Sequence, residues 1–350
     1  MSAANLDAAA DSTTPDDAGE GDFFSEDTEL FVPGAQQFDY VVGSDDVQHL
    51  VFLDGAVLRY RRFDGADLQS SIIAMGLASL HEPTIALSPL ERPRVAYVNS
   101  DQSVTTTEFD GSIWRERNES ALAEAEPDFG ARLAIDHDDR TLLGIRRASS
   151  TTVFGWRDAH TLEWMAVNGG DVGTVSPLPD FAFDADNNAH FAMIRDGGTS
   201  VSYATAADAT SGLTWEQVDS FSLSATVQVD VDGTNRPHVI VAGNDATRRR
   251  VIEYGVFNGS RWTLTEFNNE GAITDVVDIA CLADGRAALV WNEDSSLFFA
   301  IFDGTTHSDP VLVNGDATVT PEKAVIQVDS LGNVHIAYGD AFGVHVVHQI

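Results

Sequence analysis

The sequence predicts an all-β fold, and two observations along its 350 residues support this prediction. Short apolar runs alternate with Asp-Gly or Asn-Gly turns, as in residues 226–262, where a helical pattern is absent. An anchor residue, six places after the first-turn Asp or its equivalent, recurs every 45 to 50 residues at His49, Arg94, Leu142, His190, His238, Ala288 and His335. A steady period filled with strands is typical of blades, so we expect a seven-bladed β-propeller of four-stranded antiparallel blades.

The innermost strand of each predicted blade alternates with period two. Positions nine and seven before each anchor are apolar in every repeat, as in Tyr40 and Val42. Positions ten and eight are mostly small or polar, so we expect them to line a central channel. Position ten holds Asp39, Thr84, Arg132, Asp180, Gln228, Asp278 and Val325.

The second and third strands have equally regular signals. The second strand starts at the anchor and carries large apolar residues one and three places later, such as Leu50 and Phe52, which should pack between blades. The third strand leads into a Phe-Asp-Gly or Phe-Asn-Gly hairpin at residues 63–65, 109–111, 257–259 and 302–304. The glycine supplies the positive φ of a tight turn, and Trp114 and Trp262 should cap the blade edge.

The two ends of the chain complement each other. The last repeat stops at Ile350 one strand short, whereas residues 27–35 offer a spare strand. We therefore expect the propeller to span residues 27–350, with the N-terminal strand completing the last blade and covering its edge. Exchange of this strand between chains is an alternative that would make the protein a structural subunit. Residues 1–26 are acidic and poor in hydrophobic residues, as expected of a disordered tail.

Charge excludes several partners. The chain has 55 acidic and 20 basic residues, a net charge of −35, and Lys323 is its one lysine. We expect no nucleic-acid partner and no membrane insertion, because phosphates and anionic membranes would be repelled. This composition resembles that of proteins from high-salt environments. We expect an extracytoplasmic or cell-surface location with the export signal removed, or else the cytoplasm of a high-salt organism.

Three turns carry a resemblance to a known group. Gly111-Ser-Ile-Trp114, Gly212-Leu-Thr-Trp215 and Gly259-Ser-Arg-Trp262 resemble the Gly-x-x-Trp end of the Asp-box in sialidase-type (BNR-repeat) propellers. The repeat is similar to uncharacterised bacterial propellers of that group over residues 38–350. The Asp-box aspartate is replaced by Phe109, Thr210 and Phe257, and no arginine triad matches. The resemblance therefore implies the fold but not sialidase activity.

The histidine anchors and acidic turns point to structure more than to metal chemistry. His49, His190, His238 and His335 occupy equivalent positions that a ring holds apart, so we expect structural hydrogen bonds to neighbouring turns. The acidic first turns, such as residues 136–139 and 184–188, lack the full oxygen set of a calcium loop. We expect Asx turns and no cofactor, although calcium there remains an open alternative.

The candidate ligand site is the channel mouth. Three carboxylates, an arginine and an amide at position ten could hold a cation or a sugar, and a water-filled polar channel is the alternative. Mouth loops should add Arg195, Asn244, Arg248 and Asn292. The predicted ligand-binding set is therefore Asp39, Thr84, Arg132, Asp180, Gln228, Asp278, Arg195, Asn244, Arg248 and Asn292.

The sequence favours a monomeric, non-catalytic binding protein whose ligand is a glycan or a surface protein, because no complete catalytic motif is present. The alternative is a carbohydrate-active enzyme, either a glycosidase or a polysaccharide lyase. Asp180 and Asp278 would then act as acid and base, with Arg132 on an anionic sugar.

The charge pattern generates a first prediction. Because salt screens repulsion among the carboxylates, the melting temperature should rise between about 0.1 M and about 2 M NaCl. Thermal unfolding followed by circular dichroism measures this change. A melting temperature that falls with salt would contradict the high-salt interpretation.

Overall fold

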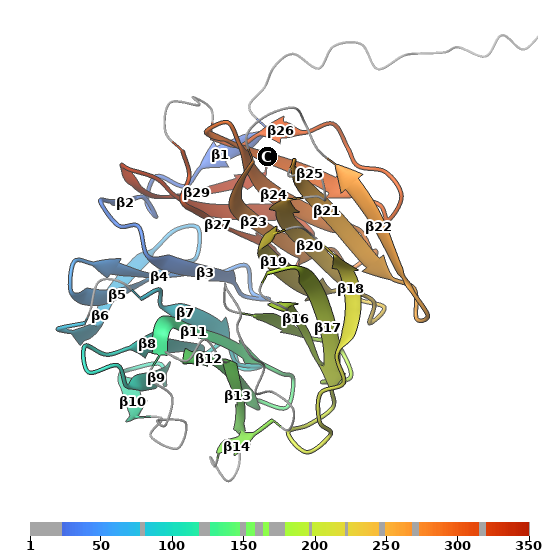
Figure 1. Ribbon diagram of the computed structural model, residues 1–350. Helices are drawn as coiled ribbons and strands as arrows, with labels where there is room; N and C mark the ends of the chain where they lie inside the picture. Colours follow the sequence, from blue (N-terminus) through green and yellow to red (C-terminus); the bar gives the residue numbers. More distant parts are fainter. Residues whose placement is uncertain are drawn as a thin grey trace, which may run out of the picture.

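The computed structural model describes residues 23–77, 81–118, 127–147, 152–157, 164–167, 179–195, 198–220, 223–244, 249–267, 273–314 and 320–349. These residues form seven antiparallel sheets around a central axis, and no helix occurs among them (Figure 1). The predicted all-β class and the number of blades are confirmed.

Six blades consist of four strands that follow one another in sequence from the axis outwards. Blade 1 has β3 (Phe38–Val42), β4 (Gln48–Asp54), β5 (Val57–Phe63) and β6 (Leu68–Met75), and blade 2 has β7 (Thr84–Leu87), β8 (Pro93–Val98), β9 (Val104–Phe109) and β10 (Trp114–Asn118). Blade 3 has β11 (Pro127–Ile135), β12 (Thr141–Arg147), β13 (Thr152–Arg157) and β14 (Trp164–Ala166), and blade 4 has β15 (Asp180–Phe183), β16 (Ala189–Arg195), β17 (Ser200–Ala206) and β18 (Glu216–Ser220). Blade 5 has β19 (Leu223–Val231), β20 (Pro237–Asn244), β21 (Arg250–Phe257) and β22 (Trp262–Phe267), and blade 6 has β23 (Ile273–Cys281), β24 (Ala287–Glu293), β25 (Ser296–Phe302) and β26 (Val311–Leu312).

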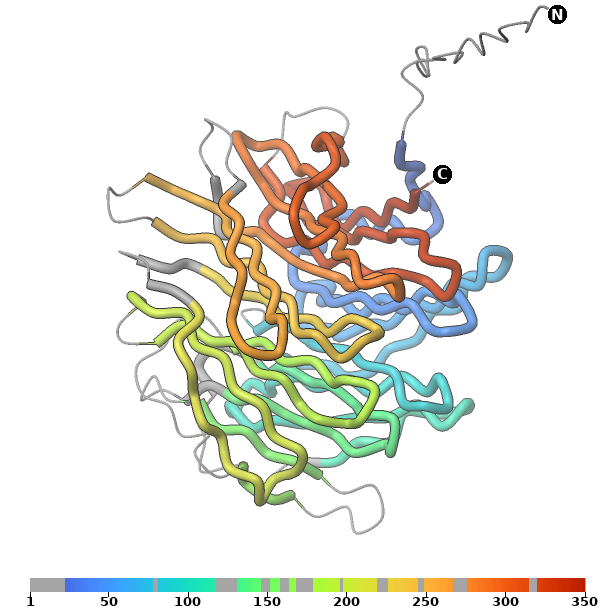
Figure 2. Tube along the Cα trace, turned by 90° about the vertical axis from the view of Figure 1, so that its right-hand side faces the viewer, coloured from blue at the N-terminus to red at the C-terminus, as the bar shows by residue number. Residues whose placement is uncertain are grey.

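Blade 7 joins the two ends of the chain. Its inner strands are β27 (Lys323–Val328), β28 (Val334–Gly339) and β29 (Gly343–Gln349). The outer edge of β29 pairs with β1 (Phe24–Glu26) and with β2 (Val32–Pro33) of the same chain. Figure 2 shows this N-terminal segment beside the C-terminal strands. The predicted closure of the ring is confirmed.

The closing segment extends further toward the N-terminus than the predicted residues 27–35. Phe24 lies in the stretch expected to be a tail, yet it pairs with Gln349 and packs edge-on against Phe299 with ring centroids 5.3 Å apart. Burial of an aromatic ring offsets the cost of ordering the backbone there. Asp27 ties the segment to blade 1, because it accepts a 3.0 Å hydrogen bond from Gln48. Residues 1–22 lie outside the described part of the chain.

The apolar core is divided among the interfaces between blades. Seven clusters of buried residues are present in the described chain, one at each junction of neighbouring blades. The large residues predicted one and three places after each anchor are all buried there, from Leu50 and Phe52 to Ile336 and Tyr338. The ring therefore has no single core, and each blade is stabilised by its two neighbours.

The hairpins and their tryptophans have the predicted roles. Gly65, Gly111, Gly259 and Gly304 have φ values of +84°, +97°, +90° and +95°, which residues with a Cβ atom rarely adopt. Trp114 of blade 2 packs edge-on against Tyr60 of blade 1 at 5.0 Å, and its indole N–H donates to Ser71. Such contacts tie the outer edge of one blade to the blade before it.

The histidine anchors are structural, as expected. His238 Nε2 lies 3.1 Å from Asp232 Oδ2, and its Nδ1 lies 2.5 Å from the Tyr254 hydroxyl. His190 repeats the arrangement in blade 4 with Asp184 and Tyr203. The same aspartates form Asx turns, since Asp232 Oδ1 accepts the N–H groups of Thr234 and Arg236. In the described chain no group of three His, Cys, Asp or Glu side chains is placed to hold a metal ion.

We predict that His238→Ala lowers the free energy of unfolding by about 3 kcal/mol, because it opens a buried cavity and removes the imidazole that joins the Tyr254 hydroxyl to Asp232. Urea denaturation measures the loss. The exposed His307 provides a control, and His307→Ala should cost less than about 1 kcal/mol. Equal losses in both variants would contradict the structural role of the buried histidine.

Candidate functional site

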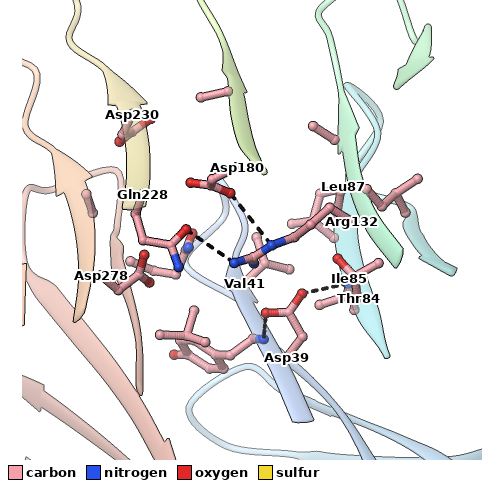
Figure 3. A pocket seen from close by; sticks show the side chains of 18 of the residues that line it. Asp39, Val41, Thr84, Ile85, Leu87, Arg132, Asp180, Gln228, Asp230 and Asp278 are labelled. Atoms are coloured by element: carbon pink, nitrogen blue, oxygen red, sulfur yellow. Dashed lines mark hydrogen bonds and ion pairs between the residues drawn. The ribbon is translucent and has the colours of Figure 1, made fainter. Parts of the chain in front are cut away.

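A cavity of about 910 Å³ runs along the axis of the ring. All fourteen side chains predicted at positions ten and eight line it, among them the seven at position ten. Its upper mouth, at the start of the innermost strands, includes Glu82, Lys323, Arg132 and Gln228. Figure 3 shows the last two of these side chains. Its lower end lies at the first turns, which contribute Ser44, Glu91 and His137. The predicted channel is therefore present.

The channel carboxylates join neighbouring blades. Asp39 of blade 1 accepts the backbone N–H of Ile85 in blade 2 at 2.9 Å. The same contact recurs from Asp180 to Val229 N (2.9 Å), from Asp230 to Cys281 N (2.6 Å) and from Asp278 to Ile326 N (2.9 Å). We call these four contacts the interblade latches. Each latch satisfies an N–H group on the inner edge of a sheet, which has no strand to pair with.

Arg132 projects into the channel from blade 3. Its guanidinium donates to Gln228 Oε1 of blade 5 at 3.2 Å, and its Nε lies 3.7 Å from Asp180 Oδ1 of blade 4 (Figure 3). Burial alone would lower the pKa of Arg132, but the carboxylates of Asp180, Asp39, Asp278 and Glu82 raise it. The side chain retains 30% of its exposure, so part of the guanidinium faces the cavity.

A second cationic side chain, Lys323, lies at the mouth on blade 7. Lys323 Nζ donates to the Phe38 carbonyl of blade 1 at 2.7 Å and to Glu82 Oε2 at 2.9 Å. Burial by itself would raise the pKa of Glu82, but the Lys323 ammonium lowers it below the ordinary value. The single lysine of the chain thus holds blade 7 to the two blades that follow it.

The carboxyls differ in their affinity for protons. Burial, together with the neighbouring charge of Asp180, raises the pKa of Asp278 to about 7. Burial also raises the pKa of Asp230 to about 6, although the N–H of Cys281 opposes this shift. Asp278 is therefore substantially protonated at neutral pH and can donate a hydrogen bond as well as accept one.

The residues predicted on mouth loops are not brought to the cavity. Arg195 lies at the end of β16 with its guanidinium over the Trp215 ring at 5.6 Å, and Asn244 lies at the end of β20. Asn292 was expected at the mouth but is fully buried within β24, because the strand extends to Glu293. Arg248 lies outside the described residues.

The sequence interpretation missed Glu82 and Lys323 as mouth residues. Each stands two places before a predicted channel position, Thr84 and Val325. Lys323 opens β27 on the same face as Val325, and Glu82 precedes the first residue of β7. Extending the period-two alternation by one step would have found both.

No protein-family model matches the sequence, and no curated protein matches it. The sialidase-type resemblance therefore has no family support, although the propeller fold that it implied is confirmed. Solved structures with a similar fold include hydrazine synthase from Kuenenia stuttgartiensis, with a TM-score of 0.62, 11% identity, and 90% of this chain and 95% of that chain covered.

Two other solved structures are carbohydrate-related proteins. An ulvan lyase bound to -[GlcA(1-4)Rha3S]- has a TM-score of 0.61 and 7% identity, with 91% of this chain and 95% of that chain covered. The six-bladed β-propeller lectin of Aleuria aurantia, which recognises fucose, has a TM-score of 0.51 and 11% identity. The match covers 91% of this chain and 93% of that chain. At such identities these likenesses show the fold alone.

We predict that Asp278→Asn makes the protein more stable than the parent above pH 7 and leaves it similar at pH 4. The folded-state pKa of Asp278, about 7, lies above the pKa of the same carboxyl in the unfolded chain. The protonated carboxyl therefore stabilises the folded state fully at pH values below the unfolded pKa. This contribution is lost as the pH rises from about 4 through about 7. The asparagine can keep the hydrogen bond to Ile326 N without the charge.

The expected gain at pH 8 is about 2 kcal/mol, since a tenfold change in an acid constant is worth about 1.4 kcal/mol and channel water screens part of it. Urea denaturation at several pH values measures it. Asp64→Asn is the control, because hydrogen bonds from the N–H groups of Asp67 and Ala66 lower the pKa of Asp64. That variant should lose stability at neutral pH. A parallel pH dependence of parent and Asp278→Asn would contradict the prediction.

Proposed function

We propose that the chain is a non-catalytic binding protein that holds a neutral glycan, free or carried by a surface protein, at the upper mouth of the channel. The observation that carries this proposal is a pair of cations held in place at the mouth. Arg132 is held by Gln228 and Asp180, and Lys323 is held by Glu82. Planar guanidinium, amide and carboxylate groups around a concave site suit sugar hydroxyls, which both donate and accept hydrogen bonds.

The latches support binding over catalysis. Both carboxylate oxygens of Asp39 accept backbone N–H groups, from Tyr40 and Ile85. Asp180 and Asp278 each use one oxygen on the next blade. An oxygen that accepts a backbone N–H is less available to accept a proton in a reaction, whereas a fixed site loses little conformational entropy when a ligand binds.

Charge favours a neutral ligand. The cavity is lined by eight Asp and Glu side chains and by two cationic ones, Arg132 and Lys323, which are already paired. A polyanionic sugar would meet net repulsion, both at the mouth and from the chain's charge of −35. Fold likeness to a lyase that is bound to a uronate-containing chain does not offset this repulsion.

A glycan array with neutral and acidic oligosaccharides tests the proposal, followed by calorimetric titration of the strongest ligand. Arg132→Gln and Gln228→Ala should each weaken binding at least about tenfold, or about 1.4 kcal/mol. Arg286→Ala is the matched control, because Arg286 is exposed outside the cavity and pairs with Asp284. An empty array, a set of acidic ligands only, or unchanged binding by both mouth variants would overturn the proposal.

One observation favours a second candidate, a carbohydrate-active enzyme. Asp278, with a pKa of about 7, could supply a proton at neutral pH, while Asp180 near Arg132 could serve as the base. Chromatography of each array ligand after incubation with the protein would reveal cleavage. Products that form with the parent and disappear with Asp278→Asn would favour the enzyme over the binding protein.

A further inference from the structure

The outermost strand of blade 1, β6, differs from the other six outermost strands. At eight residues it is the longest of them in the described chain, and none of its residues is charged. Charged residues occur in β1, β10, β18 and β22, whereas β14 and β26 have only three and two residues. Charge, shortness and β-bulges are usual means by which a protein prevents pairing at a sheet edge. β6 has neither charge nor shortness, and its bulge at Ile73 lies near its end and leaves Leu68–Ile72 in regular register with β5.

The same strand carries exposed apolar side chains. Leu68, Ile72 and Met75 are 39%, 44% and 69% exposed, and they account for three of the ten exposed large hydrophobic residues in the described chain. Ser71 and Ile73 face blade 2, where Ser71 accepts the Trp114 indole N–H and Ile73 packs in the cluster between blades 1 and 2. The outer N–H and C=O groups of β6 and its apolar residues are therefore both open to a partner.

Charge identifies the partner that fits. A second copy of this chain, with its net charge of −35, is repelled wherever carboxylates face it. At blade 1 the edge strand is neutral. On the strand behind it, Arg59 lies opposite Ile72 and is paired with Asp54, and Arg61 lies opposite Ser70 and donates to the Phe31 carbonyl. This is a region of the acidic surface where two copies can approach with little like-charge repulsion.

We propose that β6 pairs edge to edge with β6 of a second copy, in an antiparallel arrangement about a twofold axis. The two blades then form one continuous eight-stranded sheet, and the exposed apolar residues of both copies meet. Antiparallel pairing also places the acidic hairpin with Asp64 and Asp67, at the start of β6, beside the Met75 end of the partner. The two acidic hairpins are thereby kept apart.

The remaining repulsion between copies makes the dimer dependent on salt. Sedimentation of the full chain should show a monomer at about 0.1 M NaCl and a dimer at about 2 M NaCl, where charges are screened within a few ångströms. Hydrogen exchange should slow at the backbone amides of β6 under the same conditions that give the dimer.

Ile72→Lys places two like charges near the centre of the paired strands and should weaken the dimer at least tenfold. Thr263→Lys is the matched control, because Thr263 is an exposed residue on the outermost strand β22 of blade 5. It should leave the dimer unchanged, and circular dichroism verifies that both variants fold. A monomer at both salt concentrations, or a dimer unaffected by Ile72→Lys, would overturn the proposal.

Discussion

The stability of the ring depends on hydrogen-bond acceptors for the backbone N–H groups at the inner edges of its sheets. Each innermost strand pairs on one side only, and its other side faces the channel wall, where backbone N–H groups would otherwise have no protein partner. An aspartate from the preceding blade accepts one such N–H at four of the junctions described above. Asp39, Asp180 and Asp278 at position ten, and Asp230 at position eight, are therefore first of all acceptors that the architecture needs.

This structural use of carboxylates explains the electrostatics of the channel. A carboxylate that accepts backbone N–H groups would ordinarily have a lowered pKa, yet burial among like charges raises those of Asp230 and Asp278. Arg132 offsets part of the repulsion on its own side, and Lys323 does so opposite Glu82. The scaffold and the candidate site thus share residues, so the mouth is fixed before any ligand arrives.

Much of this arrangement could be predicted from the sequence, because repeats multiply weak signals. The alternation around Asp39 or Asp180 is unremarkable alone, but seven aligned copies identified the two channel-facing positions, ten and eight, in every blade. The N-terminal strand at Phe24 escaped prediction, since it has no repeat partner and its stability comes from Phe299, far away in sequence. Asn292 was placed in a loop because polar residues usually mark the end of a strand, but β24 continues through it to Glu293. Pattern alone cannot fix such a boundary.

The latches themselves could not be predicted, because a carboxylate at a channel position has the same sequence signal whether it binds a ligand or a backbone amide. What separates the two roles is the distance to a strand 46 to 51 residues later in the chain. Only the closed ring sets that distance. Residue type therefore indicated the chemistry, and topology determined how most of it is used.

The unpaired edges of the sheets are protected in three ways in this molecule, and β6 differs from the other edges. Four inner edges are satisfied by aspartate latches, the outer edge of blade 7 is covered by the N-terminal segment, and other outer edges are short or charged. Each solution follows from the cost of leaving backbone groups without partners or open to aggregation. The outer edge of blade 1 has none of these protections, in a chain with enough acidic residues to have supplied one. An uncharged strand with exposed apolar side chains is therefore better explained by a surface that pairs than by one that solvent covers permanently.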